Sequence, residues 1–152
     1  MIPGRLGVLI KALLVCGAVV AIDQLTKGIV REQVARGDSV EWLPFLKIAN
    51  TRNSGVAFGF AGGVSPLLIA FAIAFLVGLL AFLSLRRNAP PLAWLPAGLL
   101  VGGALANLAD RVRDGAVTDF IDLPAWPTFN LADVCIVVGV AMLVLLPERR
   151  RE

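Results

Sequence analysis

The chain has 152 residues, of which 58% are hydrophobic and 16% are charged, and its formal net charge at pH 7 is +3. That hydrophobic share exceeds the roughly 45–50% of typical soluble domains. The chain contains no histidine, which excludes histidine metal sites, histidine general bases and Ser-His triads. Its basic residues lie at the ends of apolar runs, a pattern typical of membrane anchoring and not of nucleic-acid binding. We therefore expect one integral membrane domain over residues 1–152, with no metal, cofactor or nucleic-acid partner.

Four apolar segments predict the fold class, an all-α membrane protein with four transmembrane helices. They cover approximately residues 6–22, 67–85, 92–109 and 131–146. The second has no charged residue, and at 1.5 Å per residue it is about 28 Å long, close to the roughly 30 Å bilayer core. The third contains Gly98 and Gly102, a spacing of small residues that permits close helix packing.

The segment between the first two spans predicts a small outer, periplasmic β-like platform over approximately residues 38–62. Residues 40–49 alternate loosely between apolar and polar side chains, which is typical of short strands. Trp42 and Phe45 suit the membrane interface. The run Asn53-Ser54-Gly55 predicts a turn.

Four spans place both termini on one side of the membrane. Dense basic clusters flank the helices on that side, namely Arg5 with Lys11, Arg86 with Arg87, and residues 149–151. The positive-inside rule therefore predicts cytoplasmic termini and an outer platform on the opposite side. A signal peptide ending near Cys16 is the alternative for the first run, but that run continues to Ile22, so we favour an uncleaved span.

Five aspartates lie in residues 102–133, between the last two apolar segments. Carboxylates so close to hydrocarbon are costly unless they are paired or solvated, so they are functional candidates. Asn130 suits a helix N-cap and Asp133 the capping-box position that follows it, although capping can also be the whole role of Asp133. Asp119 lies in an apolar stretch that would be extended, whereas Asp114 and Asp122 neighbour turn residues and are expected to be solvated.

Two facing aspartates can share one proton, because like charges about 3 Å apart cannot both ionise. One then acts as a general base on water, and the other donates a proton to a carbonyl oxygen. We expect Asp133 to be the ionised member, since a helix N-terminus favours a carboxylate, and Asp119 to carry the proton. Asn107, Asp110 and Arg111 form a third cluster, in which Arg111 either neutralises Asp110, binds a carbonyl or phosphate, or only anchors the helix at the interface.

Together these residues resemble the lipoprotein signal peptidases (signal peptidase II). Five blocks in order carry the resemblance: DQLTK at 23–27, NSGVAF at 53–58, GGALANLADR at 102–111, VTDF at 117–120 and FNLAD at 129–133. The resemblance covers the chain from Asp23 to the fourth span. Two departures are a short loop between Asp119 and Asp133, and Ala106 where the family more often has glycine.

The resemblance implies a monomeric aspartic endopeptidase of the bacterial cytoplasmic membrane, with its active site at the outer face. It implies cleavage of diacylglyceryl-modified prolipoproteins before the lipidated cysteine, contact with membrane lipids, and inhibition by globomycin-type peptides. The family's catalytic pair corresponds to Asp119 and Asp133. Its supporting polar residues correspond to Asp23, Asn53, Asn107, Asp110, Arg111 and Asn130.

Two other function classes fit the same residues. A small transporter or proton relay also uses acids near a membrane, but it predicts charges deep within spans, whereas here most charges lie at span ends. A chaperone-like protein that binds lipoprotein precursors without cleaving them would not need an aspartate pair. Cleavage of a modified prolipoprotein distinguishes the peptidase from both.

Overall fold

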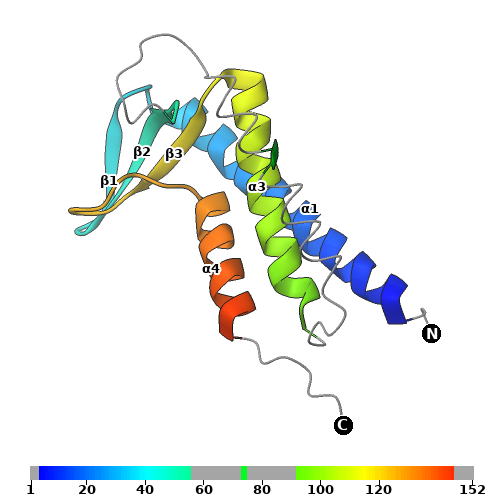
Figure 1. The fold of residues 1–152 in the computed structure, drawn as a ribbon. Coiled ribbons are helices and arrows are strands. Elements are labelled where there is room, and N and C mark those ends of the chain that lie inside the picture. The colour runs from blue at the N-terminus through cyan, green and yellow to red at the C-terminus, as the bar shows by residue number, and fades with distance from the viewer. Residues whose placement is uncertain (1–3, 56–72, 75–91, 146–152) are drawn as a thin grey trace.

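The computed structural model describes residues 4–55, 73–74 and 92–145. In these ranges the helices α1 (Gly4–Gln33), α3 (Trp94–Asp114) and α4 (Leu131–Leu145) accompany the strands β1 (Ser39–Leu43), β2 (Leu46–Asn53) and β3 (Val117–Asp122). Figure 1 shows the sheet at one end of the helices, with the first turns of α1 and the last turns of α4 at the other end. The predicted span at 67–85 lies outside the described residues.

Helix α1 is much longer than the predicted span at 6–22, because it continues unbroken to Gln33. The predicted span ended at Ile22, because the charged residues Asp23 and Lys27 follow the apolar run. The carboxylate of Asp23 is instead paired one turn later with Lys27 and buried, so these charges do not have to leave the helix for water. The stretch from Leu6 to Gln33 is long and apolar enough to cross a membrane.

Helices α3 and α4 occupy the predicted third and fourth apolar segments, and α3 extends beyond residue 109 to Asp114. Gly98 and Gly102 lie against α1, since a Cβ on Gly98 would be 2.7 Å from the Ala12 carbonyl oxygen and one on Gly102 2.8 Å from Val19 Cβ. The predicted close packing at these two glycines is confirmed. α3 therefore lies between α1 and α4, and it contacts both.

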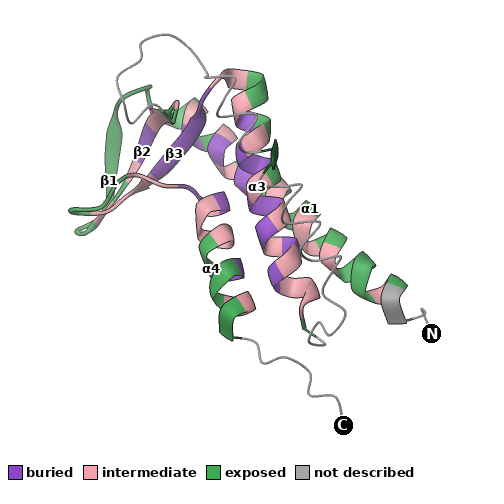
Figure 2. Ribbon diagram, viewed as in Figure 1, coloured by how far each residue is buried: buried purple, intermediate pink, exposed green. Residues whose placement is uncertain are grey.

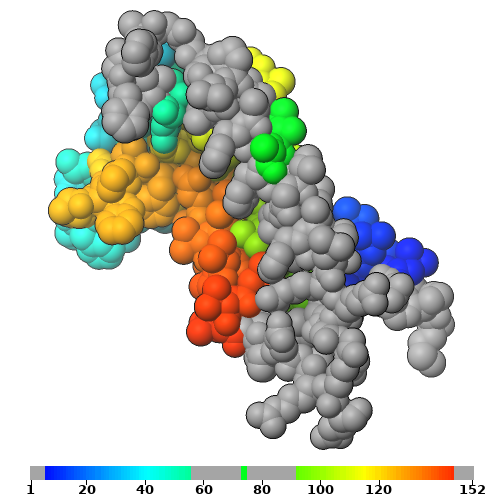
Figure 3. Space-filling view, in the orientation of Figure 1, coloured from blue at the N-terminus to red at the C-terminus, as the bar shows by residue number. Residues whose placement is uncertain are grey.

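The strands form one antiparallel sheet in the order β1-β2-β3. Of the predicted platform at 38–62, residues 38–55 are described and contain β1 and β2, while residues 56–62 lie outside the described residues. The third strand of the sheet, β3, follows α3 far along the chain. The turn predicted at Asn53 is confirmed, since the Gly55 N–H donates to Asn53 Oδ1 at 2.9 Å. In space-filling view the sheet and the loop before α4 project to one side of the helices (Figure 3).

Buried residues concentrate along α3 and on β2 and β3, whereas β1 is exposed throughout (Figure 2). A small apolar cluster contains Val30, Val34 and Phe120. Beside it lies an unusual set of buried polar residues: Asp23, Lys27, Asn50, Asn107, Asp110, Thr118, Asp119 and Asn130. Buried polar groups are costly unless they are hydrogen-bonded, so this set is where a functional site is expected.

Candidate active site

Asp119 lies on β3 and is 1% exposed. Its Oδ1 accepts a hydrogen bond from Asn130 Nδ2 at 2.6 Å, and its Oδ2 accepts one from Asn53 Nδ2 at 3.0 Å. Burial raises the pKa of the Asp119 carboxyl above its ordinary value of 3.8, against the two amide donors that lower it, and the charge of Asp133 raises it further. The Asp119 carboxyl is therefore protonated more easily than that of an ordinary aspartate, and two neutral donors hold it in place.

Asp133 lies in the first turn of α4. Its Oδ1 accepts a hydrogen bond from Asn107 Nδ2 at 2.8 Å, and its Oδ2 accepts one from the Asn130 backbone N–H at 3.2 Å. In return, the Asp133 N–H donates to Asn130 Oδ1 at 3.0 Å. The capping box predicted for Asn130 and Asp133 is confirmed. The N–H groups at the start of α4 also stabilise the negative charge of this carboxylate.

Asn130 connects the two aspartates. Its Oδ1 is occupied by the Asp133 N–H, so its Nδ2 is the end that faces the Asp119 carboxyl. The structure thus brings together the two carboxyls that the sequence had paired, although they belong to a strand and a helix on either side of a loop. Both carboxyls lie at the same end of α3 and α4, next to the sheet.

Lys27 is the residue that the sequence analysis missed. Its side chain is fully buried, and Nζ lies 2.7 Å from Asp23 Oδ2, 2.9 Å from Asp110 Oδ2 and 3.0 Å from Asn107 Oδ1. An ammonium has three N–H donors, and here it donates a hydrogen bond to Asn107 and forms ion pairs with the two carboxylates. The four-residue spacing from Asp23 was a usable signal, but only for a helix that continues past Ile22.

The Lys27 cluster also determines how Asn107 is oriented. Because an ammonium can only donate, Asn107 must turn its Oδ1 to Lys27, and its Nδ2 then faces Asp133. Asp23 contributes at the same place, since its Oδ1 accepts the backbone N–H of Ala132, the residue before Asp133. Helix α1 therefore positions the start of α4 without touching the Asp133 carboxylate.

Asp110 is neutralised by Lys27. Arg111, which the sequence analysis had considered as its partner, does not have this role. Gln24 Nε2 also donates to Asp110 Oδ1 at 2.7 Å, and Arg113 approaches that oxygen at 3.5 Å. Arg111 Nη1 lies 3.4 Å from the Asn107 carbonyl oxygen in its own helix. The reason is geometric: α1 lies against the side of α3 that carries Asn107 and Asp110, so its lysine reaches the buried carboxylate.

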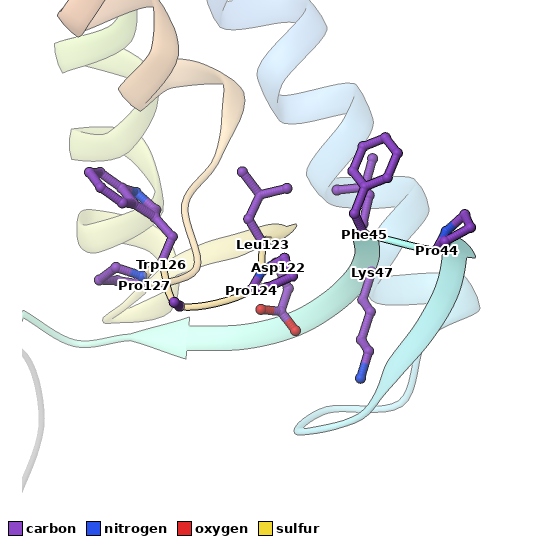
Figure 4. Close-up of a pocket in the computed structure, with 10 residues that line it drawn as sticks. Pro44, Phe45, Lys47, Asp122, Leu123, Pro124, Trp126 and Pro127 are labelled. Atoms are coloured by element: carbon purple, nitrogen blue, oxygen red, sulfur yellow. The ribbon is translucent and has the colours of Figure 1, made fainter.

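The two aspartates expected to be solvated differ. Asp114 is paired with Arg113 at 2.8 Å but stays partly exposed, so it remains in contact with solvent, whereas Asp122 is half-buried beside a hollow of about 600 Å³. Figure 4 shows this hollow between the end of the sheet, with Phe45 in the β1–β2 turn and Lys47 on β2, and the loop that carries Trp126. It contains none of the predicted site residues, so the aspartate pair and this hollow are separate features.

Comparison with known proteins identifies the family. The family model for Signal peptidase (SPase) II matches residues 15–147. A lipoprotein signal peptidase of Moorella thermoacetica is 39% identical over 148 residues, which are 92% of this chain and 97% of the relative. One from Halothermothrix orenii is 37% identical over 131 residues, or 84% of this chain and 88% of the relative.

Solved structures of bacterial membrane enzymes share the fold. A bacterial membrane enzyme determined by the in meso method at 1.9 Å resolution superposes with a TM-score of 0.80 at 34% identity, covering 88% of this chain and 90% of that one. A second, at 2.3 Å, gives a TM-score of 0.77 at 33% identity over 93% and 94% of the two chains. The chain therefore belongs to the signal peptidase II family of membrane peptidases.

Proposed function

We propose that this chain removes signal peptides from diacylglyceryl-modified prolipoproteins, cutting before the lipidated cysteine with a water activated by Asp119 and Asp133. The proposal rests on Asn130, which forms hydrogen bonds with both aspartates and so keeps them close together. The names of the relatives supply the substrate class, lipoprotein signal peptides. The paired carboxyls supply the reaction type, because they need no thiol or imidazole.

In the first step, ionised Asp133 removes a proton from the water, and the new hydroxide oxygen bonds to the scissile carbonyl carbon. Protonated Asp119 donates its proton to the carbonyl oxygen. The tetrahedral intermediate then collapses by returning that proton to Asp119, and the C–N bond breaks. The proton held by Asp133 passes to the leaving amine of the cysteine, which restores both carboxyls.

The raised pKa of Asp119 supports this division of labour, because a buried carboxyl next to another negative charge holds its proton more tightly. Asn53 and Asn130 fix the carboxyl of Asp119 from two sides. Asn107 fixes Asp133 from the side of α3. Such preorganisation reduces the rearrangement that the reaction requires.

The same geometry supports a membrane arrangement. We propose four spans with cytoplasmic termini, in which α1, α3 and α4 cross the membrane together with residues 67–85. The beginnings of α1 and α3 and the end of α4 lie opposite the sheet in Figure 1, which supports a site at the outer face. A monomer can then receive an apolar signal peptide laterally from the bilayer, and a globomycin-type peptide would compete for the same position.

Cleavage of a purified prolipoprotein tests the proposal. Wild-type enzyme in lipid should release the signal peptide from the diacylglyceryl-modified precursor and leave the unmodified precursor intact. Asp119→Asn and Asp133→Asn should each lose at least about 100-fold in kcat, the scale of general acid–base catalysis. Asp122→Asn, in the same strand as Asp119, is the matched control and should remain active. Wild-type-like cleavage by both pair variants would refute the site assignment.

A further inference from the structure

An apolar groove lies between α1 and the sheet, apart from the aspartate pair. Its volume is about 710 Å³, and its lining includes Ile29 and Val34 of α1, Trp42 of β1, Ile48 of β2 and Phe120 of β3. Its floor is the small apolar cluster that contains Val30, Val34 and Phe120. A site of this size and lining suits one flexible apolar ligand.

The groove continues an exposed apolar face of α1. Ile22, Leu25 and Ile29 are exposed and recur at spacings of three and four residues, so they form one stripe along the helix. Ile29 also lines the groove. The stretch Leu6–Gln33 has 28 residues, about 42 Å at 1.5 Å per residue, which exceeds the roughly 30 Å bilayer core. α1 is inclined to α3 and α4 in Figure 1, and its second half lies beside the sheet.

Strand β1 is amphipathic, and its apolar face lines the groove. Val40 and Trp42 alternate with Ser39 and Glu41, so the apolar pair lies on one face. Both Val40 and Trp42 line the groove, although each is more than half exposed. The groove is therefore lined by apolar side chains that the described protein residues leave uncovered, in direct continuity with a membrane-spanning surface.

From this continuity we propose that acyl chains of bilayer phospholipids occupy the groove between α1 and the sheet. The sheet then rests in the outer leaflet along α1, and lipid packs against Phe120, the residue after Asp119. The edge of β1 that no described strand pairs stays at the headgroup level, because unpaired N–H and C=O groups are costly in hydrocarbon. The inference requires α1 to cross the membrane, but it does not depend on the peptidase chemistry.

Single-tryptophan fluorescence tests it. The chain has three tryptophans, so Trp94→Phe with Trp126→Phe leaves Trp42 as the reporter in the groove. Trp42→Phe with Trp94→Phe leaves Trp126, which is 66% exposed against 67% for Trp42 but lines the other hollow. In bilayers of phosphatidylcholine with brominated acyl chains and no substrate, Trp42 should lose most of its emission and Trp126 much less. Aqueous acrylamide should show the reverse order.

A groove variant makes the test specific. Ile29→Lys should lower the quenching of Trp42 by brominated lipid at least twofold, and Glu32→Lys, an exposed position one turn further along α1, should not. If Ile29→Lys does not fold, Val40→Thr adds a hydroxyl to the groove at nearly constant volume. Quenching of Trp42 by acrylamide alone would mean a water-filled groove and overturn the proposal. Quenching by neither agent, or equal lipid quenching of Trp42 and Trp126, would also overturn it, while signal-peptide cleavage is scored separately.

Discussion

Replacing Lys27 by methionine tests the buried charge cluster most directly. The substitution keeps an unbranched apolar stem that is one atom shorter, but it removes the cation and its three donors. Asp23, Asp110 and Asn107 then lose the partner that lies 2.7, 2.9 and 3.0 Å from their oxygens. The two carboxylates remain buried, since both side chains are fully covered.

Removing one partner of a buried ion pair costs about 3–5 kcal/mol, because the other charge stays in a medium that solvates it poorly. Arg113 is 3.5 Å from Asp110, but its side chain is half exposed, so it compensates little. Changing all three groups, as in Asp23→Asn, Lys27→Met, Asp110→Asn, removes the charges together. That triple variant should therefore recover much of the lost free energy of unfolding.

The assay has two readouts. Denaturant unfolding in mixed micelles should place Lys27→Met about 3–5 kcal/mol below wild type, and Lys47→Met, an exposed lysine on β2, within about 0.5 kcal/mol. In the folded fraction, kcat should fall about 10–100-fold with KM nearly unchanged, since the hydrogen bond that orients Asn107 is lost. A Lys27→Met variant that is as stable and as active as Lys47→Met would refute the reasoning.

Two further predictions concern packing and protonation. Gly103→Ala would place a Cβ 2.5 Å from the Ala132 carbonyl oxygen, so it should displace the start of α4 and lower cleavage about 100-fold. Gly28→Ala, which meets no atom within 4 Å, should keep its activity and gain up to about 1 kcal/mol. Because burial raises the pKa of Asp119 above 3.8, the folded chain holds a proton that the unfolded chain releases, and stability falls as pH rises from 3.8 toward the raised pKa. Asp119→Asn should remove that decline in thermal midpoint; an unchanged pH slope would contradict it.

Local spacing was sufficient to predict some parts of this molecule. The three-residue spacing between Asn130 and Asp133 specifies a capping box, and the four-residue spacing between Gly98 and Gly102 specifies a close helix contact. Neither depends on distant segments, so propensity and geometry decide them. The pairing of Asp119 with Asp133 came from chemistry and family resemblance together, and its catalytic role stays a prediction.

The long-range contacts could not be predicted from local spacing. Nothing local to residues 117–122 shows that β3 completes a sheet with β2, or that Asn53 reaches Asp119 from 66 positions away. Lys27 and Asn107 are 80 positions apart. Because the predicted span ended at Ile22, the sequence analysis also did not show that Lys27 lies on the same helix and faces α3. A charge that is buried with a partner behaves like a helix-interior residue, and the sequence alone does not show that partner.

The orientation of the Asn107 amide unites these contacts and can be tested by itself. Asn107 lies between a group that only donates, Lys27, and a carboxylate that only accepts, Asp133, so each end of its amide has one correct direction. Asn107→Asp keeps the contact with Lys27 but presents an oxygen to Asp133, and an ionised carboxylate there repels the Asp133 carboxylate. Asn107→Ala only removes the donor. At neutral pH Asn107→Asp should therefore have the lower kcat, and the gap should close as pH falls, because the added carboxyl then takes up a proton. An Asn107→Asp enzyme that is more active than Asn107→Ala at neutral pH would show that the amide does not hold Asp133 through its N–H.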